Sequence, residues 1–290
     1  MKRKHFISLI TSGYLLLGMM VYTGKGYAQI QFPVPSKTEI RSFANSITYI
    51  VKEDVLISDF NLAIEDAVHK HWNMTEAELI SATEFENIRT DPTASFVYIN
   101  PVYFDEDKTY TEYKYLFLSM GDKSGSIDKM SDLCSVPLSV KGTKQDEYVY
   151  KIGLILEFLQ EHVKVCEKHP ELDEKDVVEF YTSSRDVNLE NKELWLLKDE
   201  VEPKLRGRNE MQSVYPHKFR FVKKEDIKNA IDKRRDDVLI LHLIKAGKNR
   251  YSFKLIVSAK NGGLIYYNYH KSNERKPSLL LKRDIKQFLR

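Results

Sequence analysis

Two cysteines are the side chains best suited to covalent chemistry in this sequence, and Cys134 and Cys166 are the only cysteines among its 290 residues. In an oxidising compartment they could form a disulfide that encloses about 32 residues and adds on the order of 3 to 4 kcal/mol in the chain-entropy model. The alternative is two buried free thiols. Cys166 favours burial because it follows apolar residues at helical spacing. The sequence leaves both arrangements open.

Cys134 could instead act as a nucleophile, with His162 or His169 as its base. Nothing in the sequence orders these three residues relative to one another, and no flanking signature of a thiol enzyme is present. A thiol-dependent or other hydrolase using Cys134 is therefore the alternative hypothesis, and no residue is predicted to be catalytic.

The segment His69-Lys70-His71 could supply two metal ligands if it were a strand. It lies in a predicted helix, where side chains two positions apart point in different directions, so an exposed histidine pair is expected instead. The sequence contains neither a glycine-rich phosphate loop nor an HExxH helix. We therefore predict no metal site and no cofactor.

Charge is strongly segregated along the chain. Residues 29–188 contain 16 basic and 29 acidic residues, whereas residues 189–290 contain 25 basic and 13 acidic residues. Such opposite charges can dock the two halves or leave the basic half free for an acidic partner. Docking or simple solvation is the favoured interpretation, and binding to an anionic glycolipid or membrane surface through the basic half is an alternative. The candidate patch for an anionic partner comprises Lys223, Lys224, Lys233, Arg234 and Arg235.

The amino terminus has the features of a cleavable secretory signal. Three basic residues at positions 2–4 precede an apolar run from Phe6 to about Tyr22, and the segment ends in Gly26-Tyr27-Ala28. The apolar run is shorter than the roughly 20 residues that a membrane-spanning helix needs. We predict cleavage between Ala28 and Gln29, export to the periplasm or beyond, and no transmembrane segment in the mature chain.

Similar segments recur in the same order through the chain, which indicates an internal repeat. The first pairs keep an offset of 140 to 142 residues and align 55–59 with 194–199, 79–88 with 221–230, and 96–99 with 238–241. Two further pairs align 113–117 with 251–255 and 158–159 with 288–289. We expect two copies of one folding unit.

Each copy is predicted as strand, helix, strand, helix, strand, strand, strand and helix, the first strand of copy one being the apolar run at 55–57. First helices are expected at 61–71 and 209–214. Ser81 and Glu84 have capping-box spacing at the second helix of copy one. Copy two has Lys223 in place of the serine, so it is expected to lack this cap. The segment 261–263, Asn-Gly-Gly, predicts a hairpin turn, and 121–125 is expected to fill the same place in copy one.

This order predicts an α/β (α+β) fold, a tandem repeat of two mixed-sheet units. The predicted organisation is a signal peptide at 1–28, an N-terminal extension at 29–49, an acidic first repeat at 50–168, a linker at 169–191 and a basic second repeat at 192–290. Trp72 and Trp195 are expected in the core or on a sheet face.

The signal ending in Ala28-Gln29, the two units, and the stretch Tyr215-Pro216-His217-Lys218-Phe219 and its continuation to Val222 resemble uncharacterised exported proteins of Bacteroidota. The element order, with Asp59-Phe60 after an apolar run, is also similar to the small α/β domain in the amino-terminal part of TolB and in curli-secretion and penicillin-binding-protein-activator lipoproteins. This resemblance implies assembly of envelope complexes rather than catalysis.

The sequence therefore predicts an exported, non-enzymatic binding or assembly protein of the bacterial cell envelope. Its expected partner is an envelope protein or an anionic surface. Nucleic acid is not an expected ligand, because the chain is predicted to be exported.

Overall fold

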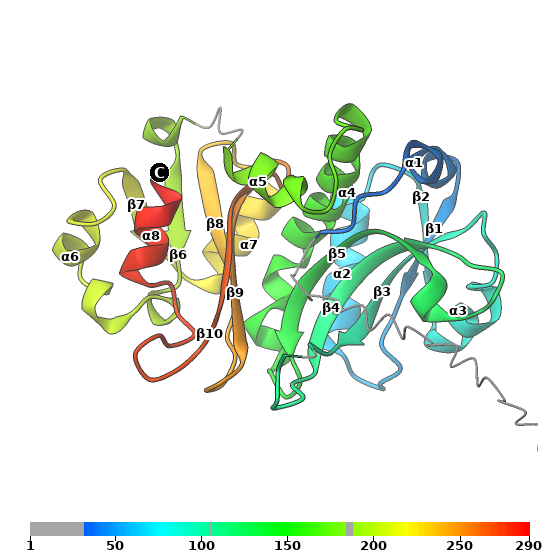
Figure 1. Ribbon diagram of the computed structural model, residues 1–290, viewed down its shortest axis with the longest axis horizontal. Coiled ribbons are helices and arrows are strands. Elements are labelled where there is room, and N and C mark those ends of the chain that lie inside the picture. Colours follow the sequence, from blue (N-terminus) through cyan, green and yellow to red (C-terminus); the bar gives the residue numbers. More distant parts are fainter. Residues whose placement is uncertain (1–31, 105, 184–187) are drawn as a thin grey trace, which may run out of the picture.

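Two five-stranded mixed sheets form the structure, a computed structural model that describes residues 32–104, 106–183 and 188–290 (Figure 1). The first sheet has the order β2-β1-β3-β4-β5 and comprises β1 (Ile47–Val51), β2 (Glu76–Ile80), β3 (Ser95–Val102), β4 (Tyr113–Met120) and β5 (Ser131–Val140). The second has the order β10-β9-β8-β6-β7 and comprises β6 (Glu193–Leu196), β7 (Lys218–Phe221), β8 (Val238–Ile244), β9 (Tyr251–Ser258) and β10 (Leu264–Lys271).

Both sheets have the same topology. In each, the first three strands along the chain are parallel, and the last two pair antiparallel. The two strand orders are identical when one is read in reverse. This confirms the predicted α/β fold of two similar mixed-sheet units, here called the first unit (β1 to α4) and the second unit (β6 to α8).

Helices cover both sheets. The first unit carries α2 (Asp59–His71), α3 (Ala82–Ile88) and α4 (Ile152–Lys168), preceded by α1 (Lys37–Ala44). The second unit carries α6 (Arg208–Gln212), α7 (Lys224–Asp232) and α8 (Lys282–Phe288). A further helix that the sequence analysis does not predict, α5 (Asp176–Ser183), lies between the units, where its buried Val177 joins the core and the helix packs on β10.

The helices α2, α4 and α7 lie at the junction of the two sheets (Figure 1). Most residues of α4 are buried, and the helix packs on α2 and β5 of the first unit and on α7 of the second. One large hydrophobic cluster therefore contains residues of both units. A second cluster, beneath α6 and α8, contains only residues of the second unit and Leu189, which precedes it. The last helix of the first unit is thus a shared layer between the units.

Alternating side chains place α2 and α3 on opposite faces of the first sheet. Val97 of β3 belongs to the large cluster with Phe60 of α2. Its neighbours Phe96 and Tyr98 point to the other face and pack with Phe85 of α3. The second unit repeats this division, since α6 joins the cluster under α8 and α7 joins the shared cluster.

Short polar side chains fix where the helices begin. Ser58 accepts a hydrogen bond from the N–H of Asn61 (3.1 Å), so α2 starts two residues earlier than predicted. Ser81 and Glu84 form the predicted capping box at 3.2 and 2.7 Å. At α7 half of that box survives, because the Asp226 carboxylate accepts from the N–H of Lys223 at 3.0 Å.

The predicted hairpin turn at 261–263 joins β9 to β10 and packs closely against α4. Gly262 has a φ of 73°, in the left-handed region that favours glycine. A Cβ atom at this position would lie 2.2 Å from the backbone nitrogen of Phe158. The turn of the second unit therefore needs a glycine both for its conformation and for its close approach to the first unit. The segment 121–125 lies in the corresponding connection between β4 and β5.

The prediction that residues 55–57 form the first strand is wrong. Strand β1 is Ile47–Val51, which pairs between β2 and β3, whereas Leu56 and Ile57 are 100% and 86% exposed in the loop before α2. An apolar run alone does not make a buried strand, since the run also needs a neighbouring strand on each side and helices or loops that cover its faces. Helix α1 and the first residues of β1 consequently lie within the range predicted as an N-terminal extension. The predicted signal and its cleavage point lie outside the described residues.

Candidate functional site

The two cysteines lie in the core of the first unit as free thiols. Cys134 is on β5, Cys166 is on α4, and both are buried. Burial raises the pKa of the Cys134 thiol well above its ordinary value and the pKa of the Cys166 thiol to about 12. Since the thiolate is the reactive form of cysteine, neither side chain is activated as a nucleophile.

The histidines considered as bases are not placed to activate Cys134. His162 Nε2 lies 3.5 Å from the sulfur of Cys166, and its Nδ1 lies 2.8 Å from the hydroxyl of Tyr181. Burial lowers the pKa of His162 to about 4. His169 is paired with Glu171 instead, at 3.1 Å. Within the described residues, no histidine forms a hydrogen bond with Cys134.

The segment His69-Lys70-His71 forms the last turn of α2, and its histidines lie in different environments. His69 is exposed, but His71 is buried, so the expected exposed pair is wrong for His71. The reason is the position of α2 against α4 and α7, which covers one side of its last turn. In the described part of the chain, no group of three or more His, Cys, Asp or Glu side chains is arranged to hold a metal ion.

Two members of the predicted basic patch pair with the first unit. Lys224 Nζ lies 3.1 Å from a carboxylate oxygen of Asp146, and Arg234 lies 2.8 Å from a carboxylate oxygen of Glu157. Both acidic partners belong to the first unit. These basic side chains therefore contribute to docking between the units.

The remaining members of the patch lie outside this interface. Arg235 pairs with Asp237, and its guanidinium carbon lies 5.0 Å from the centre of the Trp195 ring. Lys223 and Lys233 are exposed, and neither side chain forms an ion pair within the described residues. The five residues thus do not act as one free basic surface.

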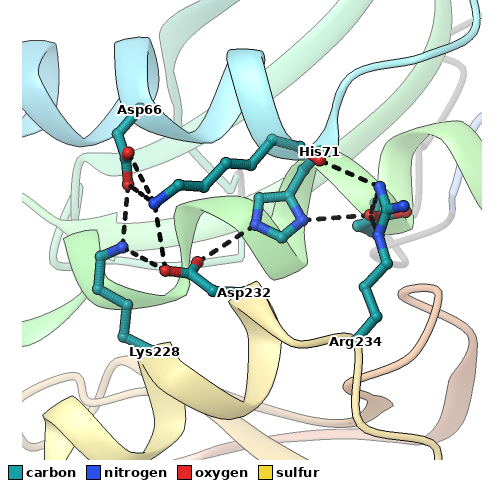
Figure 2. A network of polar contacts seen from close by, with 7 residues as sticks. Asp66, His71, Lys228, Asp232 and Arg234 are labelled. Atoms are coloured by element: carbon teal, nitrogen blue, oxygen red, sulfur yellow. Dashed lines mark hydrogen bonds and ion pairs between the residues drawn. The ribbon is translucent and has the colours of Figure 1, made fainter.

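A network of charged side chains joins α2 to α7 across the unit boundary (Figure 2). Asp66 lies between Lys70 (2.8 Å) and Lys228 (2.9 Å), while Asp232 lies 2.9 Å from Lys228 and 3.3 Å from Nε2 of His71. The hydrogen bonds from Lys70 and Lys228 lower the pKa of the Asp66 carboxyl. The acidic and basic halves therefore meet at this boundary, as the docking interpretation of the charge segregation expects.

A crevice of about 380 Å³ opens at the carboxyl ends of β1 and β3 in the first unit. This edge is where ligands bind in open α/β sheets, at the point where successive crossover helices lie on opposite faces. The first-unit crevice is lined by residues 51–54 after β1, by Ala82, Thr83, Phe85 and Glu86 of α3, by residues 98–100 of β3, and by Ile127.

The first-unit crevice has an aromatic floor and a charged rim. Phe85 and Tyr98 stack with their ring centres 5.1 Å apart. Tyr98 is oriented by Ser119, whose hydroxyl lies 3.2 Å from the Tyr98 hydroxyl. At the rim, Glu53 is held by Ser58 at 3.0 Å, whereas Asp54 is exposed and forms no ion pair within the described residues. Phe85 and Tyr98 are only 5% and 3% exposed, so their rings form the floor of the crevice, beside the exposed carboxylate of Asp54.

A segment of the first unit covers part of the corresponding edge of the second unit. A smaller crevice of about 270 Å³ remains there, lined by Glu200, by residues 243–245 and by first-unit residues between 138 and 148. The 3₁₀ turn Val149–Lys151 packs on α7. Lys151 Nζ lies 3.3 Å from Glu200, and the two side chains are only 1% and 4% exposed. The ring of Tyr150 lies 5.8 Å from Lys224 Nζ, at the start of α7. Burial raises the pKa of Glu200, against the attraction of Lys151.

Glu200 and Asp54 occupy equivalent positions in a repeated motif that the sequence analysis misses. Val51-Lys52-Glu53-Asp54-Val55 and Leu197-Lys198-Asp199-Glu200-Val201 lie 146 residues apart. The first begins at the last residue of β1, and the second begins directly after β6. The signal that could have found it is the shared pattern of an apolar residue, lysine, two acidic residues and valine. An alignment started from the apolar run at 55–57 instead shifts the two copies by several residues.

Comparison with protein-family models, with curated proteins and with solved structures gives no match for this chain. Within the described residues, no helix is both long and apolar enough to cross a membrane.

Proposed function

We propose that this chain is an exported, non-enzymatic binding protein of the bacterial cell envelope, and that it holds its partner in the first-unit crevice. The observation that carries the proposal is the difference between the two copies of one edge. In the second unit, Val149–Lys151 covers this edge beside Glu200 and leaves a crevice of about 270 Å³ that is lined largely by the first unit. In the first unit the same edge carries a larger crevice of about 380 Å³, lined by that unit alone.

The chemistry of the other candidate residues favours binding over catalysis. The two thiols are buried and have raised pKa values, so they lack the accessible thiolate that a nucleophile needs. The charged clusters are largely used in docking the units. A concave site with an aromatic floor and a few polar groups at its rim is typical of recognition.

A photo-cross-linking amino acid placed in the crevice tests the proposal. Thr83 of α3 lines the crevice and is exposed; Glu225, at the equivalent position of α7, is also exposed and supplies a matched control. In the native host, we expect a discrete light-dependent adduct from position 83 and none from position 225. The same adducts from both positions, or none from position 83, would contradict the proposal.

The location of the protein is tested separately. Because of the charged, apolar and small-residue regions at the amino terminus, the mature chain should begin at Gln29. Amino-terminal sequencing of the protein recovered from the host's envelope fraction would measure this directly. A chain that retains Met1 and fractionates with the cytoplasm would be the contrary result.

A further inference from the structure

The second unit shows what kind of group its carboxyl edge accepts. Lys151 brings an ammonium group to Glu200, and the adjacent Tyr150 places an aromatic ring near Lys224 at the start of α7. Both residues are buried in this position. The occupant is therefore a short segment in which an aromatic residue directly precedes a lysine.

A second segment covers the same edge through its backbone. Val201 and Leu280 form a parallel bridge, in which the N–H of Leu280 donates to the carbonyl of Glu200 (2.8 Å) and the N–H of Glu202 donates to the carbonyl of Leu280 (3.1 Å). Val201 is fully buried as a result. The backbone after the repeated motif is thus a template for adding an extended segment.

In the first unit the equivalent groups have no such occupants. Asp54 stands in the place of Glu200, and Val55, which stands in the place of Val201, is 53% exposed. Within the described residues, no hydrogen bond reaches the backbone N–H or carbonyl of Val55. Ala82 replaces Lys224 at the start of α3, which leaves more room beside the aromatic floor.

The charge of the first unit favours the same kind of occupant. Residues 29–188 carry 29 acidic and 16 basic side chains. In the crevice lining, Lys52 adds one cation and Glu86 is paired with Arg89 at 2.7 Å, so Asp54 is the lining carboxylate that has no ion pair within the described residues. A field of this sign attracts cationic segments and repels acidic ones. The next exposed residues, Leu56 and Ile57, extend the surface with apolar area.

We infer that the first-unit crevice binds an extended, lysine-bearing peptide segment of a partner protein. The ammonium group of its lysine pairs with Asp54, an adjacent aromatic side chain packs against Phe85 and Tyr98, and its backbone adds alongside Val55. This inference rests on the proposed function, since it names the partner chemistry of the same site.

A phage-displayed library of random peptides, panned against the full chain from Gln29 onward, tests this inference. Selected peptides should share a lysine next to an aromatic residue. Titration calorimetry with the synthetic peptides should show an affinity about tenfold weaker for Asp54→Asn, because a charge-assisted contact is lost. Glu76→Gln is the matched control, since Glu76 is an exposed carboxylate on β2 outside the crevice lining, and its affinity should equal that of the wild type.

The outcomes separate this inference from the proposed function. Selected peptides without lysine, or with equal affinity for the wild type and Asp54→Asn, would overturn the assignment of a lysine-bearing ligand. A cross-linked adduct at position 83 would in that case still support the crevice as the binding site. A failure of both experiments would reject both. Self-association that depends on Asp54, measured by sedimentation, would overturn the assignment to a separate partner. Thermal melting should be unchanged in Asp54→Asn, because this side chain is exposed.

Discussion

At one equivalent place between sheet and helix, the first unit has apolar side chains and the second unit has polar and charged ones. Because β4 and β9 begin at Tyr113 and Tyr251 and α4 and α8 align at Phe158 and Phe288, the apolar residues Leu116, Val136 and Leu154 correspond to Lys254, Asn268 and Asp284. In the second unit, Lys254 is paired with Asp284, both fully buried. Asn268 also donates to Asp284, at 3.1 Å.

This difference teaches that one topology accepts either an apolar or a polar layer at this point, provided that every polar group is satisfied. The backbone N–H of Leu281 completes the shell of Asp284 at 2.8 Å. Burial lowers the pKa of Lys254 to about 8, against the attraction of Asp284. Since burial opposes the charge, the buried pair depends on both partners being present.

Breaking this pair should have the largest effect on stability. Asp284→Leu leaves Lys254 buried without its partner and should lower the free energy of unfolding by about 3 to 5 kcal/mol. Replacing the polar layer with that of the first unit, through Lys254→Leu, Asn268→Val and Asp284→Leu together, should restore or exceed the wild-type value. Urea unfolding followed by circular dichroism measures both. A triple variant as unstable as the single one would show that the two units are not interchangeable here.

A smaller contrast is expected at the repeated motif. Glu200→Ala leaves Lys151 buried and unpaired and should lower the free energy of unfolding by about 3 kcal/mol. The equivalent change in the first unit, Asp54→Ala, should alter it by less than about 0.5 kcal/mol, because Asp54 is exposed. Equal losses from the two variants, measured by urea unfolding, would mean that the first-unit crevice is already filled by the chain itself.

Much of this fold can be predicted from the sequence, because the later strands are long apolar and aromatic runs and the turns between them carry glycine. The matching starts at Tyr113 and Tyr251 and the hairpin turn at Gly262 are examples. The first strand is harder, since the run at 55–57 is more apolar than β1, which contains Thr48 and Tyr49. Residues 47–51 become the strand because they pair with β2 and β3. No local sequence pattern reveals this pairing.

The candidate site is less predictable, because it depends on which copy of the repeated motif is covered by another part of the chain. The charge segregation is visible in the sequence, but the contacts of Asp66 with Lys228 join residues that are 162 positions apart. Likewise, Glu53-Asp54 and Asp199-Glu200 are equivalent in sequence, yet only the second pair receives Lys151. Which copy of a motif stays open follows from the packing of α4 between the sheets and not from the motif itself.

The approach of the second unit's hairpin to α4 can be tested with two glycines. Gly262 and Gly142 both have positive φ values, of 73° and 86°, but a Cβ atom at Gly142 would have no neighbour within 4 Å. Both alanine variants lose the conformational freedom of glycine, whereas only Gly262→Ala also clashes with the backbone of α4. Gly262→Ala should therefore be less stable than Gly142→Ala by about 2 kcal/mol in thermal unfolding. Equal stabilities would argue that the units separate easily at this contact.

The opposite face of each sheet reverses the pattern of polarity. Ser119 and Asp132 of the first unit correspond to Val257 and Leu264 of the second, which lie in the shared core beside α4. In the first unit this face carries the crevice, and the Ser119 hydroxyl donates to Asp132 at 2.6 Å while contacting Tyr98. A polar pair is tolerated there because Asp132 retains partial contact with solvent.

Asp132 should therefore give the first unit a small pH dependence that the second unit lacks at this position. Burial raises the pKa of Asp132 to about 6, although the Ser119 hydrogen bond lowers it. The folded chain then holds a proton that the unfolded chain has released, so this contribution to stability is present below about pH 4 and is lost as the pH rises through about 6. Relative to Asp132→Asn, the wild type should lose on the order of 1 kcal/mol across this range, which urea midpoints at successive pH values would measure. A constant difference between the two proteins would mean that Asp132 stays ionised beside Ser119, and that this face of the first sheet carries a charge rather than a neutral acid.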